Sequence, residues 1–412
     1  MKNILYYGYN PNCERAGLEE RLRSAVQNQR TTQPTEHEMI KTGTDAFVSS
    51  ISAEIKQYSS KRKHIVPISS GLDSRAILGG LINNPCIDKS NITTISFGTQ
   101  GTWDFEIGQQ IAHSVGVNNI AIDLTSSDFD WSEESLRKHT HSLDCPTRIF
   151  ESYVNHEVVT EFHEGAVIWS GFFGDPSIGS HQPKDPCDNW ELACERFAEY
   201  NRFSPHLAKK VSSPTMGLPR APHLPKEKLS FEEQLDFAHR QKCFIKPLIF
   251  SETKEYATPF LRSEWLEFAL NLPKEYRQDR SIYVEVMSEL YPNLFEFPTD
   301  MNYGLGPSVG KIRWYTQLAK LFLAKSVNSV LDTDYIYPGT NYMDFDREFR
   351  RGGCLYQTGK SLMLKLDKRG YSQINAGELW QRHQQGHDFN RAIRTLCLLE
   401  LLIESPNGEL NI

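Results

Sequence analysis

Short apolar runs alternate with amphipathic segments along the first half of the chain. Residues 64–68, 91–97, 119–124 and 166–169 are rich in apolar or β-branched side chains, as buried strands are. Helical spacing and apolar helix formers lie between them, at residues 76–82 and 104–115. Strands that alternate with helices favour a parallel sheet with helices on both faces. The pattern therefore predicts an α/β fold.

The flanking segments are less periodic and suggest a division of the chain. Residues 4–7 look strand-like, 14–27 form a charged helix, 28–38 form a polar linker, and 44–58 have helical spacing. We expect residues 1–42 to be a short N-terminal extension and 43–412 to be the main domain. Within that domain, residues 183–228 are rich in Pro, His and Lys and indicate an insertion or lid, and residues 230–412 are mostly helical.

Composition and charge exclude some function classes. Apolar residues make up 39% of the chain and charged residues 24%, so a sizeable core is available. The formal net charge of −7 provides no basic footprint for nucleic acid or for an anionic membrane. No run approaches the roughly 18 apolar residues of a membrane span, and the first residues do not resemble a secretory signal. Eight scattered cysteines without a CxxC pair indicate reduced thiols. We therefore expect a cytoplasmic protein.

The turn after the first apolar run is the strongest candidate for chemistry. Ser69, Ser70 and Gly71 are small residues between a strand and a helix, where backbone N–H groups can bind an anion. The Ser69 and Ser74 hydroxyls add donors for a pyrophosphate. Asp73 would repel a bare anion, but it suits Mg²⁺, which bridges phosphate oxygens. The alternative is an ordinary Ser/Gly turn that caps the next helix.

Three stretches in order along the chain resemble the synthetase domain of class B asparagine synthetases and β-lactam synthetases. The family's SGGxDS loop appears here as residues 69–74, with Ser70 in place of the first glycine. The family's SGEGxDExFGGY signature corresponds to residues 170–181, in which Ser170, Gly171, Asp175 and Gly179 match. The ExRxPFLD stretch corresponds to residues 255–262. The resemblance covers about residues 44–405 and implies a five-stranded parallel sheet of the adenine nucleotide alpha hydrolase type, with a largely helical C-terminal part.

The resemblance also implies roles for particular residues. In the family, ATP adenylates a carboxylate, pyrophosphate leaves, and a nitrogen nucleophile attacks the acyl-adenylate. ATP and Mg²⁺ are therefore the implied cofactors, with Asp73 and Asp175 as the metal ligands and Glu255 as part of a general base. The implied nucleotide-binding residues are Ile68, Ser69, Ser70, Gly71, Asp73, Ser74, Ser96, Phe97, Gly98 and Gly171.

Simpler explanations exist for several of these residues. Asp175, which precedes Pro176, could be a turn residue. Phe97 could belong to the core, Asp104 could be an acid favoured by the helix dipole, and Glu255 could be a solvated acid at a helix end.

Several positions depart from the family pattern. Phe172 replaces the family glutamate and Phe173 a glycine, so asparagine is a doubtful product. Asn302 stands where the family has a lysine, and Lys311 or Arg313 is a candidate substitute for the missing charge. Arg75 could pair with phosphate, although an ordinary position on the helix face explains it as well.

The start of the chain departs too. Lys2 stands where full-length asparagine synthetases have their catalytic cysteine, and we expect no glutaminase domain. The nitrogen would then come from free ammonia, a separate glutaminase or an amine on the substrate.

The function that best fits these observations is an ATP-dependent ligase that adenylates a carboxylate and forms an amide. Tailoring of a peptide, a sugar acid or another specialised metabolite would suit such an enzyme, and a homodimer is one expected assembly. One alternative is a nucleotide-binding or regulatory homologue with altered catalysis. Another, an enzyme that modifies transfer RNA, is disfavoured by the acidic net charge.

Overall fold

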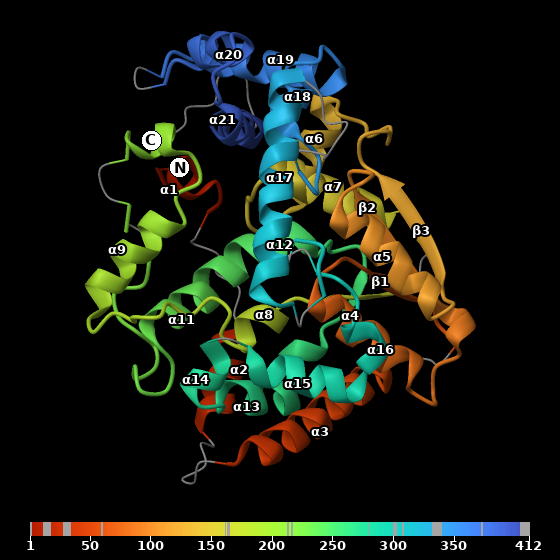
Figure 1. The fold of residues 1–412 in the computed structure, drawn as a ribbon. Helices are drawn as coiled ribbons and strands as arrows, with labels where there is room; N and C mark the ends of the chain where they lie inside the picture. The colour runs from red at the N-terminus through yellow and green to blue at the C-terminus, as the bar shows by residue number, and fades with distance from the viewer. Residues whose placement is uncertain are drawn as a thin grey trace.

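A five-stranded parallel sheet forms the centre of the protein (Figure 1). The structure is a computed structural model, and it describes residues 2–10, 18–27, 34–58, 61–160, 162, 165–211, 214–215, 217–278, 280–299, 303–306, 309–331, 340–371 and 374–403. The strand order is β3-β2-β1-β4-β5, and every pair is parallel. The strands are β1 (His64–Pro67), β2 (Ile92–Gly98), β3 (Asn118–Asp123), β4 (Val167–Trp169) and β5 (Glu255–Ala257).

Alternate side chains along the strands enter two different cores. Ile65 and Ile168 pack in one cluster, whereas their neighbours Val66 and Val167 pack in the other. This alternation is what a strand covered on both faces requires, because successive side chains point to opposite sides. The prediction of an α/β fold with a parallel sheet and helices on both faces is therefore confirmed.

Two groups of helices cover these faces, and in Figure 1 α19, α20 and α21 of the first lie above the sheet and α3, α13 and α15 of the second lie below it. The first group holds α6 (Glu133–Ser142), α7 (Ile149–Thr160), α18 (Phe345–Glu348), α19 (Cys354–Lys368), α20 (Ala376–Gln384) and α21 (Asn390–Leu402). The second group holds α3 (Glu36–Ile55), α4 (Leu72–Ile82), α5 (Trp103–Ser114), α13 (Ser263–Leu270), α15 (Ser281–Leu290) and α16 (Pro292–Phe295). The C-terminal part is thus helical, as expected.

The remaining elements build two smaller clusters beside the sheet. One is formed mainly by α1 (Lys2–Tyr7), α9 (Trp190–Tyr200), α10 (Pro205–Ala208), α11 (Phe231–Leu235) and the π-helix η2 (Asp236–Ile245). The other joins α2 (Leu18–Gln27) to Phe172, Phe173 and η2. Further short elements are α8 (Gly174–Ser177), α12 (Lys246–Ile249), α14 (Lys274–Gln278), η1 (Lys89–Asn91) and η3 (Pro259–Leu261), and the long helix α17 (Lys311–Leu331) crosses the front of the molecule in Figure 1.

Three local expectations need correction or completion. The strand expected at residues 4–7 is wrong, because this segment is helical, buried and packed against α10. A four-residue apolar run does not distinguish a strand from a buried helix. The position of the edge strand β5 was not predicted, although the resemblance implied a five-stranded sheet, because β5 has only three residues. The segment 183–228, expected as an insertion or lid, contains α9, whose Trp190 and Phe197 are buried in a core cluster.

Among the described residues, no helix combines the length and apolarity needed to cross a bilayer.

The helix α4, which begins at the candidate loop, packs closely against the end of α15. A Cβ atom added at Gly79 would lie 2.5 Å from the ring of Tyr291, a side chain that is 6% exposed. Gly79 therefore allows the approach that holds α4, and the loop before it, against the second group of helices.

We predict that Gly79→Ala lowers the free energy of unfolding by about 1–2 kcal/mol, because overpacking outweighs the better helix propensity of alanine. Urea denaturation measures this loss. Gly306→Ala is the control, since a Cβ at Gly306 would meet only the Glu296 carbonyl oxygen at 3.5 Å, an ordinary contact, and its effect should stay within about 0.5 kcal/mol. Equal stability of the two variants would contradict the packing argument.

Candidate active site

The loop Ser69–Ser74 lies directly beyond the carboxyl end of β1 and is organised by its own serines. Ser69 Oγ accepts a hydrogen bond from the Gly71 N–H at 3.1 Å, and the Ser69 N–H donates to Ser74 Oγ at 3.3 Å. Gly71 is the N-cap residue of α4, with φ −73° and ψ 157°, and offers no side-chain cap. The first turn of α4 therefore presents backbone N–H groups without a capping side chain, a common setting for anion binding.

Asp104 and Arg75 hold this loop in place. One carboxylate oxygen of Asp104 accepts hydrogen bonds from both the N–H and the hydroxyl of Ser70. Asp104 is in the first turn of α5, so the dipole explanation remains compatible with its position, but its contact is with the loop.

Arg75 is completely buried, and its Nη2 donates to the Ser70 carbonyl at 2.7 Å. Its Nη1 donates to the carbonyls of Leu294 and Phe297 at 3.3 and 2.8 Å. The suggestion that Arg75 pairs with phosphate is therefore wrong, because its guanidinium group is committed to backbone carbonyls inside the protein.

The two predicted metal ligands, Asp73 and Asp175, meet across the ends of β1 and β4. The Asp175 N–H donates to Asp73 Oδ2 at 3.0 Å, and the Tyr283 hydroxyl donates to Asp73 Oδ1 at 2.7 Å. Asp175 Oδ1 in turn lies 2.9 Å from Nη1 of Arg280. Burial, followed by the negative charge of Asp175, raises the pKa of Asp73 well above its usual range.

This arrangement fits a magnesium ion that is shared with a phosphate ligand. Two carboxylates and one guanidinium group leave one negative charge, which a proton or an added cation can neutralise. Mg²⁺ in nucleotide sites commonly takes one or two protein carboxylates, with phosphate oxygens and waters completing its shell. Within the described residues, no group of three or more His, Cys, Asp or Glu side chains forms a metal cluster. Asp73 and Asp175 are thus the residues that could hold the ion.

The turn after β4 is shaped by the Asp73 side chain. A Cβ added at Gly171 would lie 2.9 Å from Cβ of Asp73, and one added at Gly174 would overlap the Asp73 carboxylate. Between them, Phe173 adopts φ 73°, a left-handed conformation that favours glycine. Both Phe172 and Phe173 are buried, so this turn combines a glycine-like backbone with apolar side chains.

Ile68 and residues 96–98, which the resemblance implies as the lining of an adenine pocket, lie near the carboxyl ends of β1 and β2, but their side chains are largely enclosed. Ile68 belongs to the core, and the buried Ser96 lies 3.1 Å from Asn119 Oδ1. The Phe97 ring packs edge-on against Tyr342 at 6.3 Å.

The end of β2 is covered by another segment of the chain. The Thr99 N–H donates to the Asn341 carbonyl at 3.1 Å, and the Thr99 hydroxyl donates to the Tyr342 carbonyl at 2.7 Å. A Cβ added at Gly98 would lie 2.6 Å from the Asn341 carbonyl oxygen. Residues 341–342 therefore occupy the space beside Phe97 and Gly98 that the sequence suggested for a base.

Glu255, the first of the three predicted catalytic residues, does not lie at the loop. Glu255 pairs in register with Val167 and through it with His64, which places it at the amino ends of the strands, the opposite edge of the sheet. There it forms an ion pair with Arg62. Glu255 is therefore a strand residue and not the helix-end acid considered as its simpler explanation. Lys311 is exposed at the start of α17, and Asn302 lies outside the described residues.

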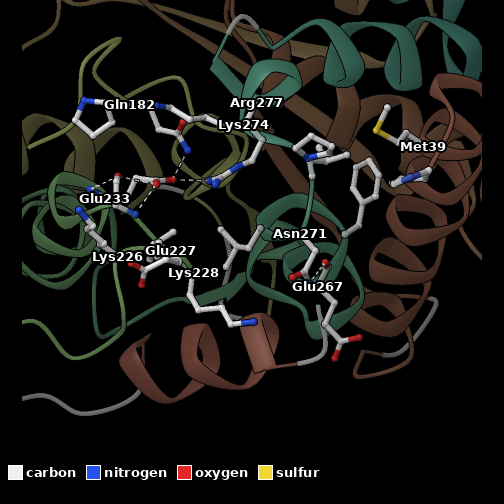
Figure 2. A pocket seen from close by; sticks show the side chains of 18 of the residues that line it. Met39, Gln182, Lys226, Glu227, Lys228, Glu233, Glu267, Asn271, Lys274 and Arg277 are labelled. Atoms are coloured by element: carbon white, nitrogen blue, oxygen red, sulfur yellow. Dashed lines mark hydrogen bonds and ion pairs between the residues drawn. The ribbon is translucent and has the colours of Figure 1, made fainter. Parts of the chain in front are cut away.

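A cavity of about 790 Å³ lies elsewhere, between α3, α13, α14 and the segment that precedes α11 (Figure 2). Its lining includes Arg277 and Glu233, a buried ion pair of 2.7 Å, and Gln182, which donates to Glu233 at 2.6 Å. Glu233 also completes the capping box of α11. These contacts indicate a structural network. The lining also includes positively charged lysines and negatively charged glutamates, so neither sign of charge dominates (Figure 2). We therefore place the candidate active site at the loop and not in this cavity.

Sequence reasoning missed two residues that complete the site. Tyr283 and Arg280 contact Asp73 and Asp175 from the start of α15, more than 100 positions away along the chain. No local motif marks them, because a tyrosine and an arginine near a helix start are common surface or core residues. Comparisons of the chain with protein-family models and with curated proteins found no match.

We predict that Asp104→Ala lowers the free energy of unfolding by about 1.5–3 kcal/mol, because two donors of Ser70 lose a charged acceptor. Chemical denaturation measures the loss, and hydrogen exchange at the Ser70 amide should accelerate. Asp128→Ala is the control, since Asp128 is exposed. Unchanged protection of Ser70 in Asp104→Ala would show that Asp104 does not hold the loop.

Proposed function

We propose that the protein is an ATP-dependent ligase that adenylates a carboxylate and transfers the acyl group to ammonia or to an amine. The observation that carries the proposal is the meeting of Asp73 and Asp175 beside the uncapped first turn of α4. In parallel α/β sheets, ligands bind beyond the carboxyl ends of the strands, where this group lies. The resemblance of residues 69–74 and 170–181 to the asparagine synthetase and β-lactam synthetase family supports the same assignment, including its adenine nucleotide alpha hydrolase-type fold.

Each described group has a defined task in this proposal. The N–H groups of the first turn of α4, with the Ser69 and Ser74 hydroxyls, would bind the pyrophosphate portion of ATP. Asp73 and Asp175 would hold Mg²⁺. When bound, this ion would neutralise the negative charge that develops on the departing pyrophosphate. Asp104 and Arg75 position the loop through Ser70 and do not touch the nucleotide.

A cation other than the family lysine is already present at the carboxylates. The Arg280 side chain is 16% exposed and lies 2.9 Å from Asp175 Oδ1. An arginine in this position can pair with a phosphate oxygen or with Asp175, whichever is closer in a given state. We propose that Arg280 supplies positive charge near the phosphates, a role for which Lys311 and Arg313 were the earlier candidates.

The second candidate is a nucleotide-binding homologue with altered catalysis. The position of Glu255 at the opposite edge of the sheet favours it, because the residue implied as part of the general base then lies away from the loop. The two candidates differ in a measurable way. A ligase releases pyrophosphate when it is given its acid, whereas a binding module binds Mg·ATP without turnover.

We predict that Asp73→Asn weakens Mg·ATP binding and lowers pyrophosphate release by about 100-fold or more, because the ion loses a carboxylate at the point of developing charge. Asparagine keeps the size of the side chain, and the ligand-free Asp73 carboxyl is already disposed to be neutral, so the melting temperature should change little. Isothermal calorimetry with Mg·ATP measures binding, and a coupled assay with a panel of acids measures release.

Asp45→Asn, an exposed position on α3, is the matched control and should behave like the unmodified protein. Failure of the unmodified protein to bind Mg·ATP would contradict both candidates. Binding that survives Asp73→Asn without loss would contradict the role of Asp73 as a metal ligand.

A further inference from the structure

The long helix α17 exposes large apolar side chains along its outer face. Three of them, Ile312, Phe322 and Val330, are 86%, 72% and 84% exposed. The complete set is Ile312, Tyr315, Phe322, Leu323, Val327 and Val330. No other described helix or strand exposes more than two large apolar side chains. Single exposed apolar residues need no explanation, but a concentration of them on one element marks an interaction surface.

These six side chains form one continuous apolar stripe. Their spacing follows the three- and four-residue steps that place side chains on one face of a helix. The exposed Ala319 and Ser326 lie within the stripe and are small, so they do not interrupt it. From Ile312 to Val330 the stripe is about 27 Å long, at a rise of about 1.5 Å per residue.

The opposite side of α17 attaches the helix to the protein. The partly buried residues of this side are Trp314, Gln317, Leu318, Leu321 and Ala324. The Trp314 ring packs against Tyr303 at 5.4 Å, and Gln317 Nε2 donates to the Tyr303 carbonyl at 3.0 Å. The attached side and the apolar stripe are therefore different faces, and α17 lies at the outside of the molecule (Figure 1).

Basic residues border the apolar stripe. The helix contains no Asp or Glu, and its basic residues are Lys311, Arg313, Lys320 and Lys325. On a helical projection, the exposed Lys311 falls at one edge of the stripe, and the exposed Arg313 and Lys320 fall at the other. The net charge of −7 is a sum over the whole chain and hides this positive segment. The expectation that the chain offers no footprint for an anionic membrane therefore does not apply to α17.

This charge pattern disfavours a second copy of the chain as the partner of the stripe. A symmetric contact between the stripes of two copies would bring the basic borders of both helices together. Because α17 has no acidic residue to pair with them, these like charges would repel each other. The complementary partner is apolar where it meets the stripe and negatively charged on both sides of it.

We propose that α17 binds an anionic lipid surface, with the apolar stripe at the acyl chains and Lys311, Arg313 and Lys320 at the lipid phosphates. A protein partner would need an apolar groove of about 27 Å with acidic residues on both rims. An anionic bilayer offers both features in every direction along its plane. Apolar burial and attraction to anionic headgroups both strengthen such binding, and long basic side chains can keep their charges at the headgroups. The inference goes beyond the proposed function and does not depend on it.

Co-sedimentation of the full-length protein with lipid vesicles tests this proposal. Vesicles of phosphatidylcholine are compared with vesicles that also contain about 30% phosphatidylglycerol. We expect the partition coefficient to be at least about tenfold higher on the anionic vesicles and to fall as salt is added. Phe322→Ser combined with Leu323→Ser should lower binding to the anionic vesicles at least about tenfold, because the stripe loses two large apolar side chains. Arg313→Gln combined with Lys320→Gln should lower it about tenfold and reduce its salt dependence.

Double variants at exposed positions on other helices are the matched controls. Leu192→Ser with Leu364→Ser removes two exposed leucines, and Arg23→Gln with Lys41→Gln removes two exposed basic residues. Both should bind the vesicles as the unmodified protein does. Melting temperatures establish that every variant is folded.

The proposal is overturned if the anionic vesicles bind no more protein than the neutral ones. It is also overturned if the folded Phe322→Ser/Leu323→Ser variant binds them normally. Sedimentation equilibrium identifies the competing partner. A dimer that this double variant dissociates, together with no binding to vesicles, would assign the stripe to a second copy of the chain and overturn the lipid assignment.

Vesicle binding and nucleotide binding can fail separately. Asp73→Asn should bind the anionic vesicles normally, because Asp73 lies at the loop and not on α17. If the protein binds the vesicles but not Mg·ATP, the lipid assignment stands and the ligase assignment fails. If it binds Mg·ATP but not the vesicles, the ligase assignment stands and the lipid assignment fails.

Discussion

The buried guanidinium group of Arg75 joins the candidate loop to the rest of the molecule. It binds the Ser70 carbonyl on one side and the carbonyls of Leu294 and Phe297 on the other. A buried cation that loses these acceptors would bear a desolvation cost of several kcal/mol, so the loop and the segment after α16 must keep their relative positions. Everything proposed for the site depends on this connection, because it fixes where the first turn of α4 points.

Electrostatic balance at Asp73 and Asp175 explains why the site requires partners from distant parts of the chain. Two carboxylates this close disfavour each other's ionisation, and burial adds to the effect on Asp73. The Tyr283 hydroxyl and the Arg280 guanidinium reduce the cost, and a bound cation would reduce it further. Because the two carboxylates outnumber the single guanidinium group, the site can bind a cation, which is the property that a Mg·ATP site needs.

The sequence predicted the parts of this structure that follow from local patterns. Four strands were recognisable as apolar runs, and the loop was recognisable from its small residues after a strand. β5 was missed because its three residues are too few to show a period, and its register, set by pairing with β4, placed Glu255 at the wrong edge for catalysis. Tyr283 and Arg280 were missed because their roles arise from tertiary packing. A hydrogen bond between residues 210 positions apart leaves no local signal.

The turn after β4 shows which features of the site are constrained and which can vary. Gly171 and Gly174 have no room for a side chain beside Asp73, so the Asp73 side chain constrains the backbone path. Phe173 keeps that path at φ 73°, at a cost of about 1–2 kcal/mol, and burial of its ring against Phe237, 4.8 Å away, offsets this cost. The backbone of this turn is thus constrained by the proposed phosphate site, whereas the side chains at Phe172 and Phe173 can vary. Since Phe172 also lines a cavity of about 500 Å³ beside β5, a change at this position alters that cavity without moving the groups proposed to hold ATP.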